Sequence, residues 1–138
     1  MSKKRALIVA FIALLIFGAI FYVSNLKTQQ IKTVRMSGEG FEPKSVTIQR
    51  GTKVIFRNED NSPRWPASDV HPTHKRYPGS TLDKCGTPEE KKSFDACGRN
   101  PREDYSFVLN EVGRWTYHDH LKPSLVGEII VLENSQTP

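Results

Sequence analysis

The histidines of this chain fall into two close pairs. His71 and His74 lie in the segment WPASDVHPTHKRYP, and His118 and His120 lie in the segment GRWTYHDHLKPSLVGEIIV. Imidazole is a common ligand of copper, zinc, nickel and iron. Residues i and i+2 of a strand point to the same face, and a proline stiffens the turn between the first two histidines. Because two preorganised pairs can meet at one ion, the pattern predicts one metal site built from all four histidines.

Two aspartates, Asp69 and Asp119, stand beside these histidines in the sequence. A histidine that binds a metal often donates its second ring N–H to a carboxylate, which fixes the orientation of the ring. Each aspartate is therefore a candidate partner of a histidine, or a direct ligand. The alternative for the aspartates is a solvated loop, and for the histidines it is a chance arrangement of surface or capping residues.

The two cysteines lie in one polar segment, LDKCGTPEEKKSFDACGRNP. In an oxidising compartment Cys85 and Cys97 can form a disulfide. A loop of about a dozen residues closed in this way gains roughly 3 kcal/mol of stability in the chain-entropy model. The alternative is that one or both thiolates bind a metal.

The N-terminal segment has the composition of a membrane anchor. Residues 3–5 are basic, and Ala6–Val23 contains no charged residue. Eighteen helical residues span roughly 27 Å, close to the thickness of the hydrocarbon layer. The basic residues favour an N-terminus in the cytoplasm, and no small-x-small cleavage site follows the apolar run. We therefore expect residues 1–24 to form a cytoplasmic stub and an uncleaved signal anchor, followed by a linker at 25–30, with the rest outside the cytoplasm.

The remainder of the chain has the pattern of a β protein. Short alternating or β-branched runs separated by turn residues predict a β-sandwich or barrel. These runs are Ile31–Met36, Ser45–Gln49, Lys53–Asn58, Tyr105–Asn110, Arg114–His118 and Gly127–Glu133. Residues 59–104 show no periodicity apart from a turn or two of possible helix from Pro88, and we expect them to be a long insert within a domain spanning 31–134. The tail, 135–138, is expected to fray.

Two segments of this pattern resemble the cupredoxins, the small blue-copper β-sandwich proteins of the plastocyanin kind. GFEPKSVTIQRGTKVIFRNED is similar to their opening strands, and GRWTYHDHLKPSLVGEIIV is similar to their closing strand, ligand loop and strand. The resemblance runs from about Ile31 to Glu133. It implies an all-β, cupredoxin-like Greek-key sandwich, here preceded by a single N-terminal transmembrane helix.

The copper ligands of that family are missing from this sequence. The family's closing loop carries Cys, His and Met, and the resemblance places these positions at Asp119, Lys122 and Leu125. Its first histidine ligand falls near Arg64 or Trp65. A blue site requires a Cys thiolate beside two histidines. The cysteines of this chain lie far from the closing loop in sequence, which favours the disulfide between them. The chain instead resembles a variant group of bacterial cupredoxin-like proteins in which HPTH and YHDH phrases occur together.

These observations predict a membrane-anchored, extracytoplasmic or periplasmic protein that binds a metal ion. Copper(II) is the first choice because it leads the affinity order of divalent ions, and zinc is the second. The expected role is copper buffering, delivery or resistance rather than catalysis. The alternatives are an electron-transfer cupredoxin, a copper redox enzyme of the superoxide dismutase kind, and a metal-free binding module. The net charge is +5, but the basic residues form no stripe, so we expect no nucleic-acid partner.

Overall fold

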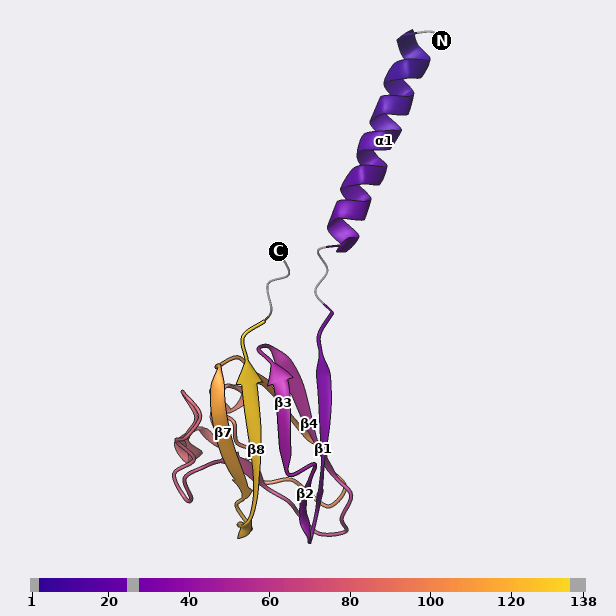
Figure 1. Cartoon of the computed structure of the whole chain (residues 1–138). Coiled ribbons are helices and arrows are strands. Elements are labelled where there is room, and N and C mark those ends of the chain that lie inside the picture. Colours follow the sequence, from indigo (N-terminus) through magenta and orange to yellow (C-terminus); the bar gives the residue numbers. More distant parts are fainter. Residues whose placement is uncertain (1–2, 25–27, 135–138) are drawn as a thin grey trace.

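The computed structural model describes residues 3–24 and 28–134. Helix α1 (Lys3–Ser24) stands apart from a β domain (Figure 1). The helix is long and apolar enough to cross a membrane, and its apolar stretch is not buried against the domain. A signal sequence shares this length and composition. The predicted tail at 135–138 and residues 25–27 of the predicted linker lie outside the described residues.

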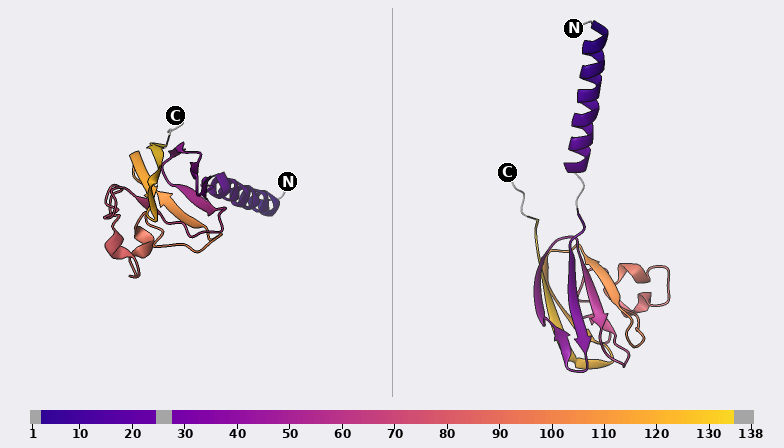
Figure 2. Two further views of the ribbon diagram at one scale, coloured as in Figure 1. Left: turned by 90° about the horizontal axis from the view of Figure 1, so that it is seen from below. Right: turned by 90° about the vertical axis from the view of Figure 1, so that its right-hand side faces the viewer.

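The β domain consists of two four-stranded sheets, with strand orders β2-β1-β4-β6 and β3-β8-β7-β5 (Figures 1 and 2). Strand β1 is parallel to β4, strand β3 is parallel to β8, and the other pairs are antiparallel. The predicted all-β sandwich is thereby confirmed. The strands are β1 (Ile31–Ser37), β2 (Gly40–Glu42), β3 (Ser45–Gln49), β4 (Thr52–Asn58), β5 (Pro66–Ser68), β6 (Tyr105–Leu109), β7 (Gly113–Asp119) and β8 (Lys122–Leu132).

The core lies between the two sheets and is rich in aromatic rings. Alternation along β4 buries Val54 and Phe56 completely, as the sequence period predicts. The Phe56 ring lies 5.2 Å from that of Tyr117 on the opposite sheet and 5.6 Å from that of Phe94. Since Phe94 belongs to the long insert, the insert contributes to the core rather than hanging from it.

The insert is more ordered than its sequence suggests. It contains strand β5, which pairs with β7, and two short 3-10 helices at Leu82–Lys84 and Glu90–Lys92. The second of these lies where a turn or two of helix was expected. Cys85 and Cys97 form the predicted disulfide. Strand β5 could not be recognised in the sequence because it has only three residues and two of them, Pro66 and Ala67, are of types depleted in strands.

Two further strand assignments from the sequence were wrong. Strand β2 lies between the predicted strands Ile31–Met36 and Ser45–Gln49, where only turn residues were expected. Strand β8 begins at Lys122 instead of Gly127, and Asp119 pairs with Lys122 across a tight turn. The loop expected between the predicted strands Arg114–His118 and Gly127–Glu133 is therefore only a turn at His120 and Leu121. Since hydrogen bonding to the neighbouring strand continues to Asp119, tertiary pairing overrides the weak local signal there.

The β7–β8 turn lies at the end of the sandwich away from the point where the chain enters it. At the entry end, the Lys53 N–H donates to the Gln30 carbonyl and the Arg50 N–H donates to the Leu132 carbonyl, both at 2.8 Å. Strand β8 runs from Lys122 to this end, so its first residues lie at the opposite one (Figure 1). The second histidine pair is thus held at the far end of a rigid sheet.

Candidate metal centre

The structure brings all four histidines together. One ring nitrogen from each of them lies within 4.8 Å of the others. His118 ends the regular part of β7 and His120 occupies the turn that follows, whereas His71 and His74 come from the insert just after β5. Strand β5 pairs with β7, with Ala67 opposite His118, so the insert delivers its histidines directly beside the second pair.

The spacing within two pairs of these nitrogens is that of ligands on a single metal ion. His71 Nδ1 lies 3.3 Å from His118 Nε2, and His74 Nε2 lies 2.9 Å from His120 Nδ1. Two nitrogens at about 2.0–2.1 Å from one ion, at angles between 90° and 110°, are about 2.8–3.4 Å apart. The donor set therefore suits an ion that accepts imidazole, with Nε2 of His74 and His118 and Nδ1 of His71 and His120 facing it.

Asp69 orients the ring of His118. The His118 Nδ1–H donates to Asp69 Oδ1 at 2.7 Å, which leaves Nε2 facing the other histidines. The His118 hydrogen bond, aided by one from Thr116, lowers the pKa of Asp69 despite its partial burial. A carboxylate behind a metal-binding histidine fixes its tautomer and makes the ligand more basic.

Asp95 plays the same part for His74, and sequence reasoning missed it. The carboxylate of Asp95 contacts Nδ1 of His74, and both side chains are fully buried. Its other oxygen accepts hydrogen bonds from Trp65 Nε1 at 2.6 Å and from the Cys97 N–H at 2.8 Å. No spacing in the sequence links Asp95 to a histidine, because the fold of the insert alone makes the contact.

His120 is held by Trp65. The two rings are tilted by 35° with centroids 4.3 Å apart, and the His120 N–H donates to the Trp65 carbonyl at 2.8 Å. Burial, and then the neighbouring histidines, lower the pKa of His120. Both effects favour the neutral ring, which is the form that binds a metal.

Asp119 is engaged away from the histidine rings. Its carboxylate accepts a hydrogen bond from Arg64 Nη1 at 3.0 Å and from the N–H groups of Trp65 and Leu121 at 3.1 Å. Arg64 also pairs with Asp60. The position where the resemblance to cupredoxins places the Cys ligand, and one of the two candidate positions for the first His ligand, are therefore occupied by a buried Arg64–Asp119 ion pair.

The histidine cluster opens to solvent on one side. His74 and His118 are buried, His120 is partly exposed and His71 is exposed. Two exposed apolar side chains, Val70 and Leu121, lie next to these histidines in sequence. The exposed side of the cluster is therefore the side that His71 occupies.

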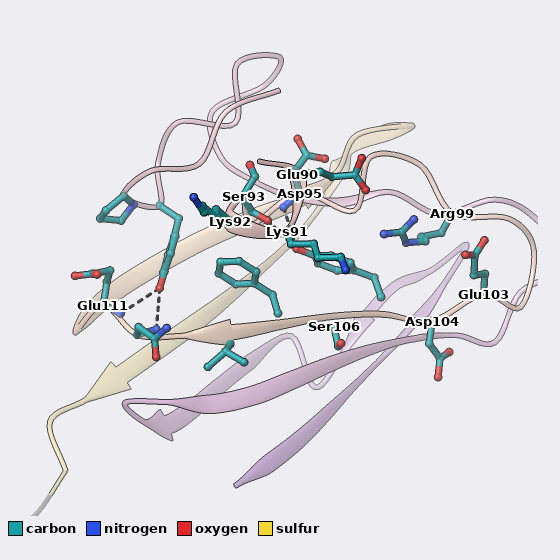
Figure 3. A pocket seen from close by; sticks show the side chains of 16 residues that line it. Glu90, Lys91, Lys92, Ser93, Asp95, Arg99, Glu103, Asp104, Ser106 and Glu111 are labelled. Carbon is teal, nitrogen blue, oxygen red and sulfur yellow. Dashed lines mark hydrogen bonds between the residues drawn. The ribbon is translucent and has the colours of Figure 1, made fainter. Parts of the chain in front are cut away.

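A separate groove of about 780 Å³ lies between the insert and β6 (Figure 3). The 16 described residues that line it include Asp95 but no histidine. Lys91, Lys92 and Arg99 face it together with Glu90, Glu103 and other acids. Asp95 thus lies between this groove and His74, and the groove itself contributes no ligand nitrogen.

Comparison with models of protein families finds no match, and neither does comparison with curated proteins. Solved structures do match. A novel purple cupredoxin from Nitrosopumilus maritimus is 19% identical with a TM-score of 0.53, over 72% of this chain and 98% of that one. An oxidized mutant of amicyanin is 16% identical with a TM-score of 0.54, over 79% of this chain and 88% of that one. A Cu-containing nitrite reductase (NirK) from Thermus scotoductus SA-01 is 25% identical with a TM-score of 0.55, over 79% of this chain but 24% of that one. The chain therefore has a cupredoxin-like fold.

Proposed function

We propose that this protein binds one copper(II) ion through His71, His74, His118 and His120. The observation that carries the proposal is the convergence of one nitrogen from each histidine within 4.8 Å. Carboxylates behind His74 and His118 support it, because such partners typically orient histidines that bind metals. A chance gathering of surface histidines does not account for two buried rings with their second nitrogens already engaged.

Copper is preferred over zinc for two reasons. Among divalent ions of the first transition row, copper(II) binds nitrogen ligands most tightly. The similar solved structures include a Cu-containing nitrite reductase and purple cupredoxin. Zinc is the second choice, because four imidazoles in a tetrahedral arrangement also suit it.

The site is not a blue-copper centre. In the described part of the chain, the two cysteines are joined in a disulfide, so neither offers a thiolate. A blue centre needs a Cys thiolate beside its histidines. The copper form of this protein is therefore expected to be pale.

The role that fits best is to buffer or deliver copper, or confer resistance to it, outside the cytoplasm. Helix α1 serves as the membrane anchor, and the disulfide agrees with an oxidising compartment. The histidines lie at the end of the sandwich away from the chain entry, so the site lies at the end of the domain opposite the linker to α1. The exposed ring of His71 allows exchange of the ion with a partner or with a small chelator.

The proposal is tested with the full chain in detergent, loaded with copper(II) and freed of excess ion. Elemental analysis should give one copper per chain, and electron paramagnetic resonance should show hyperfine coupling to several nitrogens. The quadruple variant in which all four histidines become alanine should retain no stoichiometric copper. A wild-type chain without stoichiometric copper or zinc would instead favour a metal-free binding module.

A further inference from the structure

We infer that the carboxylates of Asp69 and Asp95 make the four-histidine site selective for a divalent ion, so that copper is held as Cu(II) and not as Cu(I). The inference rests on the proposed metal site. According to this inference, Asp69 and Asp95 determine the relative affinity for Cu(II) and Cu(I), which the four imidazoles alone do not determine. It also argues against electron transfer and superoxide dismutation, both of which need a readily reduced ion.

The surroundings of Asp95 are those of a hydrogen-bond acceptor. One oxygen accepts from Trp65 Nε1 at 2.6 Å and from the Cys97 N–H at 2.8 Å, and the other contacts His74 Nδ1. Each of these partners is able to donate a proton, so the carboxyl group acts only as an acceptor. Since Asp95 and His74 are fully buried, little water screens the charge.

Asp69 places a second negative charge behind the other buried ring. Its Oδ1 lies 2.7 Å from His118 Nδ1, and its side chain is 27% exposed. The charge of Asp69 is therefore more screened by water than that of Asp95. We expect Asp69 to act in the same direction with a smaller effect.

The charges of the site balance for a dication and not for a monocation. Four neutral imidazoles contribute no charge, and the two carboxylates contribute −2. A divalent ion makes the assembly neutral, whereas Cu(I) leaves a net negative charge in a largely buried place. Such an uncompensated charge is costly in a medium of low dielectric constant.

The neighbouring cation does not cancel these carboxylates. Arg64 is the buried cation at this end of the sandwich among the described residues, and it pairs with Asp60 and Asp119. The charge of Arg64 is therefore already matched by these two carboxylates and is not available to Asp69 or Asp95. Arg76, which acts electrostatically on Asp69, is exposed to solvent and so is screened.

The test compares the affinities of the full chain for Cu(II) and for Cu(I), each measured by competition with a chromophoric chelator. The variants are Asp95→Asn and Asp69→Asn. The control is Asp60→Asn, which removes a carboxylate from the same end of the molecule but whose side chain bonds to Arg64. Circular dichroism and thermal unfolding show which variants fold. If the buried substitution Asp95→Asn prevents folding, Asp69→Asn alone tests the inference.

The ratio of Cu(II) to Cu(I) affinity should fall by about ten- to a hundredfold in Asp95→Asn, and by less in Asp69→Asn. It should change little in Asp60→Asn. Equal losses of affinity for the two ions in folded variants, or a rise of the ratio, would overturn the inference and leave the metal site standing. Failure of the wild-type chain to bind either ion would instead overturn the proposed function.

Discussion

The buried carboxylate of Asp95 contacts Nδ1 of His74, a residue 21 positions earlier in the chain. This contact joins the two halves of the insert. Asp95 also accepts a hydrogen bond from the N–H of Cys97, and Cys97 is joined by the disulfide to Cys85. The orientation of a proposed metal ligand thus depends on a covalent link outside the histidine cluster.

Reduction of the disulfide should therefore weaken metal binding as well as the fold. The bond joins residues 12 apart, and its loss should lower the free energy of unfolding by about 3 kcal/mol. The loop that carries Asp95 then loosens, and Cu(II) affinity should fall. The measurement is chemical unfolding and Cu(II) titration of a Cys85→Ser, Cys97→Ser double variant. An unchanged Cu(II) affinity in the folded double variant would show that the disulfide does not support the site.

Removal of a proposed ligand should cost more affinity than removal of the carboxylate behind it. Replacing a residue behind a metal ligand typically costs 10–100-fold in affinity. His118→Ala should lower the affinity by more than this, because it removes the ring nitrogen that β7 holds in place. Asp69→Ala should stay within it, because Nε2 of His118 remains. Isothermal titration with Cu(II) measures both, and equal losses would argue against His118 as a ligand.

Stability and metal binding should both fall in mildly acidic solution. Burial lowers the pKa of His120 in the folded protein below the value of about 6.5 for an unperturbed histidine. As the pH falls, the ring of His120 takes up a proton more readily in the unfolded chain than in the folded one. The free energy of unfolding is therefore unaffected by this ring above about pH 6.5 and decreases as the pH falls below that value. Protons also compete with the metal for the same nitrogens.

The measurement for this prediction is the free energy of unfolding of the metal-free protein between about pH 8 and pH 5. His120→Asn should show a shallower decline over the part of this range below about pH 6.5, because it lacks the titrating ring. A wild-type protein that becomes more stable as the solution is acidified would contradict the prediction.

Gly127 should not tolerate a side chain. It lies opposite Tyr117 in the β7–β8 ladder, and a Cβ there would overlap the ring and hydroxyl of Tyr117. Tyr117 is fully buried and packs 4.7 Å from the Phe41 ring, so it has little room to move. Gly127→Ala should lower the free energy of unfolding by about 1–3 kcal/mol. Ser124→Ala, an exposed site on the same strand, is the control, and equal stability of the two variants would refute the overlap.

Much of the β framework follows from local sequence. Alternation marks β1, β3 and β4 because one face of each strand is buried and the other is not. The histidine pairs are visible because their spacing is local, and the resemblance to cupredoxins pointed to the sandwich that the structure shows.

Features that depend on the path of the insert were out of reach. Strand β5 exists because β7 offers it a partner, and Asp95 meets His74 because the insert folds back on itself. The Arg64–Asp119 ion pair similarly joins residues 55 positions apart. No local period encodes these contacts. A sequence pattern instead favours residues that are neighbours in the chain, which is why Asp119, beside His118, was predicted as a partner of a histidine.

The most direct test of the four-histidine site is a crystal structure of the copper-loaded protein with an anomalous difference map at the copper edge. We expect one peak about 2 Å from Nε2 of His74 and His118 and from Nδ1 of His71 and His120. A peak elsewhere in the domain, or one bound by only one of the two histidine pairs, would contradict a site shared by all four histidines.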